Sequence, residues 1–230
     1  MSNFGWDEIY RPLGALFEPW ADAALAGYQR GQLLLRCPFD LRMDWGLKEQ
    51  ALGLVCTTPR PLASDWERAM RSLDRTLVLV GFGGLGLQLD PELFLRWPNH
   101  HFLMASPAQA VQARALQQVQ NLTWLPGSVR PVDVFPLCSR QLGKPGFSTF
   151  CEALDQGVGL HVVERRDFAE VAALMDGLRR HGNHRFLTRD QLEQGDWQLD
   201  RPLIAPEAAP LPNHGAQRAA EALIAVAESQ

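Results

Sequence analysis

The sequence of 230 residues contains no apolar run that approaches the length needed to cross a membrane, and its net charge of −4 creates no strong basic field. The first ten residues, MSNFGWDEIY, lack the basic start and the apolar core of a signal peptide. These absences argue against a membrane span and against nucleic acid or an anionic membrane as a partner. They predict a cytoplasmic protein.

The sequence also has few groups that could bind a metal. The four cysteines are widely scattered and form no C-x-x-C pair, so they are expected to be buried, reduced thiols: Cys37, Cys56, Cys138 and Cys151. His181 and His184 form H-x-x-H across a glycine, with no third ligand placed near them, which predicts no metal site. His161 lies inside an apolar run and is expected to be a packed core histidine.

Strands and helices alternate from residue 76 onward. The apolar runs TLVLVGF (76–82), HHFLMAS (100–106) and VGLHVVE (158–164) are typical of parallel strands that are covered on both faces. Helical patterns follow them, and one of these helices should begin at Pro91 with Asp90 as its cap. The alternation predicts an α/β protein with a doubly wound, Rossmann-like parallel sheet.

The first 75 residues and the segment 196–214 differ from this rhythm. Residues 4–28 are predicted to be helical, with bends or breaks at Pro12 and Pro19, and strands are expected at 32–39 and 52–58. Ser64 and Glu67 have the spacing of a capping box for a helix over 64–73. Residues 196–214 contain four prolines and are expected to form a long surface connection before a closing helix.

The glycine loop GFGGLG at residues 81–86 matches G-x-G-x-x-G through Gly81, Gly83 and Gly86. A dinucleotide fold would also place an acidic residue at the end of the next strand, but that strand ends in alanine, serine and proline at 105–107. The missing acidic residue argues against NAD binding. The loop is either a tight turn or a place where the backbone approaches a ligand, and the sequence leaves both open.

The stretch GKPGFSTFCEAL at residues 143–154 has the composition of a phosphate-binding helix start. Gly146 leaves room for a large anion, Lys144 adds a positive charge, and Ser148 and Thr149 place hydroxyl and N–H groups in the first turn. Glu152 follows on the same helix face and could accept two hydrogen bonds from a ribose diol. The alternative is an ordinary capped helix that carries a solvated glutamate.

A longer stretch, VDVFPLCSRQLGKPGFSTFCEALDQGVGLHVVERRDFAE at 132–170, resembles the donor-binding segment of nucleotide-sugar glycosyltransferases with the GT-B fold. It is similar to the group that contains MurG and monogalactosyldiacylglycerol synthase. The resemblance extends from LVLVGFGG (77–84) through NLTWLP (121–126) to NHGAQRAAEAL (213–223), and the run KPGFSTFCEAL is its most specific part. It implies one GT-B half, the half that binds the sugar donor.

The resemblance further implies that a nucleotide-diphosphate sugar, UDP-linked, is the ligand and that no other cofactor is required. The diphosphate would be lined by Gly146, Phe147, Ser148 and Thr149, and the ribose would be held by Glu152. The base would be bordered by Trp124, Leu125 and Pro126, and the donor sugar would be faced by Arg166, Asp167 and Glu170. Gly83 and Gly84 would lie at the interdomain cleft.

The chain departs from the family pattern at its start. Only about 75 residues precede the first donor-domain strand, fewer than a typical domain of roughly 100–150 residues. Residues 1–75 are therefore interpreted as a helix-and-strand remnant of the N-terminal GT-B domain plus a linker, and residues 76–230 as the donor-binding domain. The acceptor site and catalytic base come mainly from the N-terminal domain in this family, so no catalytic residue can be named.

Three functions remain open at this point. The first is sugar transfer to an unknown acceptor by a hexosyltransferase-like enzyme. The second is nucleotide-sugar binding without turnover, by a subunit that self-associates or is completed by a partner protein through apolar residues near Phe4, Trp6 and Ile9. The third is a GT-B-fold epimerase, for which HGNH (181–184) and RRDFAE (165–170) are the only candidate acid and base segments.

Overall fold

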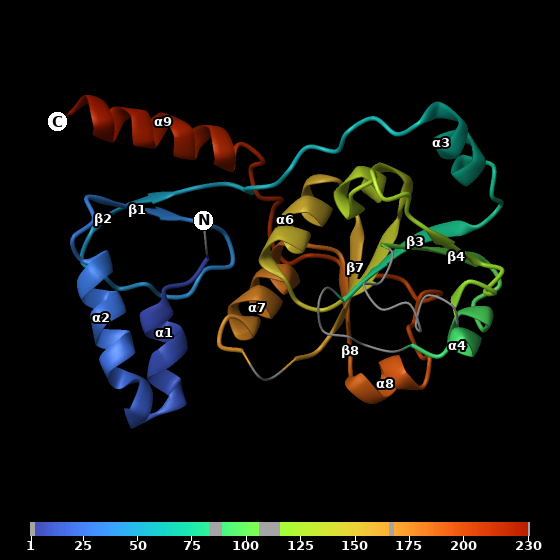
Figure 1. Cartoon of the computed structure of the whole chain (residues 1–230), viewed down its shortest axis with the longest axis horizontal. Helices are drawn as coiled ribbons and strands as arrows, with labels where there is room; N and C mark the ends of the chain where they lie inside the picture. The colour runs from blue at the N-terminus through green and yellow to red at the C-terminus, as the bar shows by residue number, and fades with distance from the viewer. Residues whose placement is uncertain (1–2, 83–88, 106–115, 166–167, 230) are drawn as a thin grey trace.

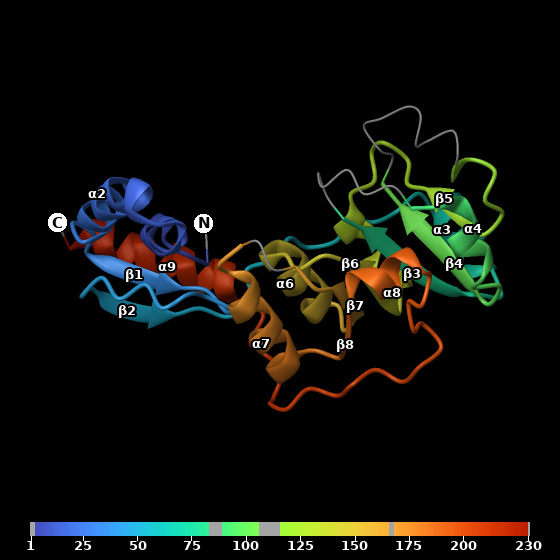
Figure 2. The same cartoon turned by 90° about the horizontal axis from the view of Figure 1, so that it is seen from below.

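The computed structural model describes residues 3–82, 89–105, 116–165 and 168–229. The chain forms two lobes (Figures 1 and 2). One contains the first strands and helices together with the C-terminal helix, and the other is built on a large sheet. Among the described residues, no helix combines the length and apolarity needed to cross a membrane.

The large lobe contains a six-stranded, fully parallel sheet. Its strands are β3 (Thr76–Gly81), β4 (His100–Met104), β5 (Leu122–Trp124), β6 (Arg140–Gly143), β7 (Gly159–Val163) and β8 (His184–Leu187). Their order across the sheet is β5-β4-β3-β6-β7-β8, so the chain moves outward from β3 in one direction and then from β6 in the other. This is the doubly wound, Rossmann-like arrangement, and it confirms the predicted fold class.

Helices cover both faces of this sheet, because successive strand residues point to opposite sides. One core lies under α6 (Phe147–Asp155) and α7 (Val171–His181) and includes Leu79, Leu160 and Phe150. The other lies under α4 (Pro91–Leu95) and α8 (Arg189–Glu193) and includes Phe94 and Trp197. The 3₁₀ segment η4 (Pro131–Leu137) connects β5 to β6. α4 is capped as predicted, since the Asp90 carboxylate accepts the Glu92 N–H at 2.9 Å.

The first lobe has short helical pieces and a small parallel sheet. The predicted helix over 4–28 is divided into α1 (Trp6–Tyr10), η1 (Arg11–Leu13), η2 (Ala15–Phe17) and α2 (Glu18–Tyr28), with Pro12 and Pro19 each near the start of a piece. The strands are β1 (Leu33–Arg36) and β2 (Lys48–Ala51). The second strand predicted, at 52–58, is instead the linker that leads to α3 (Ser64–Arg71).

The C-terminal helix α9 (Gly215–Glu228) lies against the first lobe and not against the large sheet (Figures 1 and 2). Its Ala219 is buried with Cys37 and Leu52, which belong to the first lobe. The approach is fixed by backbone hydrogen bonds, from the Leu54 N–H to the Pro212 carbonyl at 2.6 Å and from the Gly215 N–H to the Leu54 carbonyl at 3.0 Å. The domain boundary at residues 75 and 76 stays a prediction.

The capping box expected at the start of α3 was wrong. α3 begins at Ser64 itself, its N-cap is Ala63, and no side chain caps it among the described residues. Glu67 does not reach back to form a capping box, because it pairs with Arg71 one turn onward at 2.8 Å.

The segment 196–214 is not simply a surface connection. Trp197 is fully buried in the second core, where its indole N–H donates to the Leu192 carbonyl at 3.0 Å. Leu199 is also buried, and Ile204 pairs with His184 at the sheet edge. A large apolar side chain that completes a core outweighs the local preference of a proline-rich stretch for the surface.

Candidate functional site

The site is built at the carboxyl edge of the sheet, between β3 and β6. The chain reverses its direction of winding at this point, and open α/β sheets bind ligands there. Gly81 and Gly143 end the two strands and lie opposite one another. A Cβ on Gly143 would lie 2.5 Å from the Gly81 carbonyl oxygen, so a side chain there would clash with the neighbouring strand. The two backbones approach closely because glycine occupies this position.

Three residues separate helix α6 from β6, and the first turn of the helix lies at this edge. Its N-cap, Gly146, has an extended backbone with φ −165°, and no described side chain caps the helix. Among the described residues beyond its chain neighbours, a Cβ on Gly146 would meet only Thr149 Oγ1, at 3.9 Å, so the N-cap position itself is not crowded by them. Ser148 is exposed, and Thr149 and Lys144 are half-buried. The first turn therefore presents uncapped N–H groups and hydroxyls, an arrangement that favours an anion.

Glu152 lies one turn inside α6 and faces the linker. Its half-buried carboxylate accepts hydrogen bonds from the hydroxyl and the N–H of Thr57. Burial raises the pKa of Glu152, while the Thr57 hydrogen bonds and the nearby Arg130 partly offset that rise. A ribose diol at this carboxylate would have to share it with Thr57 or replace it.

Glu170 precedes α7 on the neighbouring strand-to-helix connection. It is half-buried, accepts a hydrogen bond from the Asn3 side chain, and lies within electrostatic range of Lys144 and Arg165. Burial raises its pKa, and the two cations lower it. Lys144 and Glu170 are thus brought to the same edge, and the start of the chain reaches this edge as well.

The other predicted site residues have different surroundings. Phe147 packs partly against the small core of Cys37, Leu52 and Ala219, so it also anchors the first lobe. Trp124 packs against the second core, on the sheet face opposite α6, whereas Leu125 belongs to the α6 face. Gly83, Gly84, Arg166 and Asp167 lie outside the described residues.

Pro126 borders a hollow of about 310 Å³ that Arg60, Trp66 and Asp133 also line. No sequence pattern indicated the ion cluster that Asp133 forms here with Arg60 and Arg130. Asp133 is almost completely buried and accepts hydrogen bonds from Arg130 at 2.6 Å and from Arg60 at 2.9 Å. The Arg130 hydrogen bonds, with those of Arg60, hold the Asp133 pKa far below its usual range. Since both guanidinium groups are already paired, this hollow offers little free positive charge to an anion.

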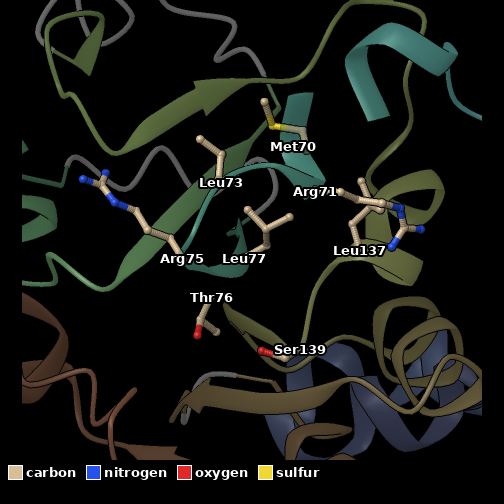
Figure 3. A pocket seen from close by; sticks show the side chains of 8 residues that line it. All are labelled: Met70, Arg71, Leu73, Arg75, Thr76, Leu77, Leu137 and Ser139. Carbon is tan, nitrogen blue, oxygen red and sulfur yellow. The ribbon is translucent and has the colours of Figure 1, made fainter. Parts of the chain in front are cut away.

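A second hollow, of about 360 Å³, lies at the opposite end of the strands (Figure 3). Thr76 at the start of β3 and Ser139 just before β6 line it. Arg71, which also lines it, pairs with Glu67. This hollow is at the amino edge of the sheet, whereas the α6 N-terminus is at the carboxyl edge, so it is separate from the candidate site.

No protein-family model and no curated protein sequence matches the chain. Solved glycosyltransferase structures share its fold. The glycotransferase of kitacinnamycin matches with a TM-score of 0.56 and 17% identity, over 80% of this chain and 55% of its own. The spinosyn forosaminyltransferase SpnP matches with a TM-score of 0.54 and 16% identity, over 84% of this chain and 54% of its own. Arabidopsis thaliana UGT89C1, solved in complex with quercetin, matches with a TM-score of 0.57 and 14% identity, over 85% of this chain and 52% of its own.

The chain therefore spans about half the length of these structures. At these identities the match establishes the fold and not the substrate. The chain has the fold of one half of a GT-B glycosyltransferase.

Proposed function

We propose that the chain binds a nucleotide-diphosphate sugar, UDP-linked, at the carboxyl edge between β3 and β6. The observation that supports this most directly is the uncapped α6 N-terminus at the point where the sheet reverses its winding. The diphosphate lies on Gly146, Ser148 and Thr149, and Lys144 adds positive charge. Glu152 holds the ribose, and the donor sugar lies towards Glu170.

In a transferase, the reaction at this site is displacement at the anomeric carbon of the sugar. The acceptor oxygen forms the new bond, and the nucleoside diphosphate leaves with the electron pair of the broken bond. Negative charge grows on the leaving phosphate, where the N–H groups of the α6 first turn stabilise it.

The first test is calorimetric titration of the protein with UDP, GDP and ADP, on the wild type and on Glu152→Ala. One nucleotide should bind, and the variant should bind it about 5- to 150-fold more weakly, which corresponds to about 1–3 kcal/mol for a lost buried polar contact. Glu221→Ala, an exposed change on α9, is the control and should leave the affinity unchanged.

A second variant separates ribose binding from an effect on the linker. Thr57→Val removes the hydroxyl that donates a hydrogen bond to Glu152 but keeps the Glu152 carboxylate. If Glu152 binds the ribose, this variant should bind the nucleotide at least as well as the wild type. If Thr57→Val weakens binding as much as Glu152→Ala does, the glutamate acts through the linker. The proposal would be refuted if the folded wild-type protein bound none of the three nucleotides.

The second candidate is binding without turnover, by a subunit completed by another copy or another protein. It is favoured by the exposed apolar side chains of the first lobe, which include Leu13, Leu16 and Trp20 at 57%, 81% and 66% exposure. Turnover separates the two candidates. Release of free nucleoside diphosphate in the presence of a broad panel of donors and acceptors supports the transferase. Tight binding of a nucleotide sugar without this release supports the non-catalytic subunit.

A further inference from the structure

Gln141 is a buried polar residue in the middle of the sheet, next to the candidate site. Only 4% of its surface is exposed, and its Oε1 has no hydrogen-bond partner among the described residues. Its Nε2 lies 3.3 Å from the position that a Cβ on Gly143 would take and 3.8 Å from that on Gly81. The side chain therefore leans along β6 towards the carboxyl edge, over the two glycines that end the central strands.

A glutamine is unexpected at this position on stability grounds. The central strands of a parallel sheet are covered on both faces and are normally apolar, as the neighbouring Leu142 is. A buried amide oxygen without a partner costs free energy, because it has lost its hydrogen bonds to water and gained none. Polar groups of this kind in a native core call for an explanation, and a ligand that completes the hydrogen bond is one.

The location limits what that ligand group can be. Gln141 precedes the N-cap of α6 by five residues, and Gly143, over which its amide lies, precedes it by three. An anion on the α6 first turn would thus be near the amide. A phosphate oxygen at neutral pH has no hydrogen to donate to Oε1. A hydroxyl group can donate to Oε1 and also accept from Nε2, so it satisfies both halves of the carboxamide.

We propose that the Gln141 carboxamide binds a hydroxyl group of the transferred sugar of the nucleotide sugar. This inference rests on the proposed function, which already assigns the diphosphate to the α6 first turn and the ribose to Glu152. The remaining hydroxyl groups of such a ligand belong to the sugar beyond the diphosphate. Gln141 thereby helps to distinguish a sugar nucleotide from the free nucleotide.

The test compares Gln141→Met with the wild type by calorimetry and by thermal unfolding. Methionine has a similar shape but cannot form either hydrogen bond. The probes are three matched pairs: UDP and UDP-glucose, GDP and GDP-mannose, and ADP and ADP-glucose. In the pair that binds, the variant should lose about 10-fold in affinity for the sugar nucleotide and less than about 2-fold for the free nucleotide. The melting temperature of the free variant should be equal to or higher than that of the wild type.

The matched control is Leu142→Met, the next residue on the same strand, which packs into the core on the opposite face. It should change neither affinity nor the difference between the two members of the pair. If Gln141→Met does not fold, Gln141→Asn keeps the amide and shortens it by one carbon. That variant should show the same selective loss for the sugar nucleotide.

Two results would overturn the inference while the proposed function stands. In the first, Gln141→Met binds the sugar nucleotide as the wild type does, which makes Gln141 a structural residue. In the second, the variant loses the same factor of affinity for the sugar nucleotide and for the free nucleotide, which places the Gln141 contact on the nucleotide. In either case Glu152→Ala would still weaken nucleotide binding. A wild-type protein that binds no member of any pair overturns both proposals together.

Discussion

His161 shows how burial decides the state of a single residue. It is fully buried in β7, with Nδ1 2.9 Å from the Trp197 carbonyl and Nε2 3.1 Å from Arg140 Nη1. A guanidinium can only donate, so Nε2 accepts and Nδ1 carries the proton. Burial, with the nearby Arg140 charge, lowers the His161 pKa to about 3, and the ring stays neutral. The expectation of a packed histidine is confirmed.

This neutral histidine predicts a pH dependence of stability. Its pKa is about 6.5 in the unfolded chain and about 3 in the folded one, so the unfolded chain binds more protons between these values. The His161 contribution is fully present above about pH 6.5 and decreases as the pH falls towards 3, by at most about 1.4 kcal/mol per pH unit. Between pH 7 and 5, the free energy of unfolding should fall less steeply for His161→Asn than for the wild type. Equal slopes in urea titrations would contradict this.

At the scale of elements, the linker over 52–63 connects parts that are far apart in the sequence. Leu54 exchanges backbone hydrogen bonds with Pro212 and Gly215, next to α9, and Thr57 donates to Glu152 of α6. Arg60 then pairs with Asp133, which belongs to η4. The linker thereby holds the C-terminal helix, the candidate site and the loop before β6 in one arrangement.

Gly53 is the point where this linker can be separated from the C-terminal segment. A Cβ at residue 53 would collide with the Pro212 carbonyl. Gly53→Val is therefore expected to destabilise the protein by about 1–3 kcal/mol and to reduce hydrogen-exchange protection in α9 more than in α7. The control is Gly27→Ala in α2, where a Cβ meets no atom within 4 Å and alanine should stabilise the helix by about 0.5–1 kcal/mol. Unchanged α9 protection in Gly53→Val would show that the linker does not hold this helix.

At the scale of the whole molecule, the two-lobed shape leaves a large surface. The accessible surface is 12,879 Å², whereas a compact monomer of 25.7 kDa is expected to expose about 10,400 Å². The difference exceeds the roughly 800 Å² that each partner of a standard-sized protein interface buries. Exposed apolar side chains gather on the short helices of the first lobe, at Leu13, Leu16 and Trp20.

This surface predicts self-association through the first lobe. The wild type should form dimers at micromolar concentration in size-exclusion chromatography with light scattering. Leu16→Glu should shift the protein to the monomer without lowering its melting temperature, because Leu16 is 81% exposed and contributes little to the core. A matched change on another exposed leucine, Leu95→Glu on α4, should leave the dimer intact. A monomeric wild type at all concentrations tested would refute self-association.

Local sequence patterns were sufficient for much of the fold. Apolar runs of strand length predicted most of the parallel strands, and Asp90 followed by Pro91 predicted the start of α4, because these features depend on a residue and its near neighbours. The central strand β6 was not predicted, because its sequence, Arg140–Gly143, is not a continuous apolar run. The stretch around Gly146 likewise predicted a helix with a glycine-led start. The assignment of its residues to a nucleotide sugar is still a prediction.

Other features depended on which of several available partners a side chain contacts in the folded chain. Ser64 and Glu67 had the spacing of a capping box, yet Glu67 pairs with Arg71. Trp197 lies at the start of a proline-rich segment, yet its side chain packs in a core beside Phe94 and Phe102. Nothing local marked the three-way contact of Asp133 with Arg60 and Arg130. These outcomes depend on which side chains meet after the chain has folded.

The amino-acid sequence by itself determined the alternation of strands and helices, the doubly wound sheet that follows from it, and the glycine-led start of α6, because hydrophobic period and backbone preference act over a few residues. Only the tertiary structure decided that α9 packs on the first lobe, that Thr57 reaches Glu152, and that the Gln141 amide is buried over Gly81 and Gly143. Each of these arrangements brings together residues that are far apart in the sequence, such as Gln141 and Gly81, and its free energy depends on packing and hydrogen-bond geometry that no local pattern encodes.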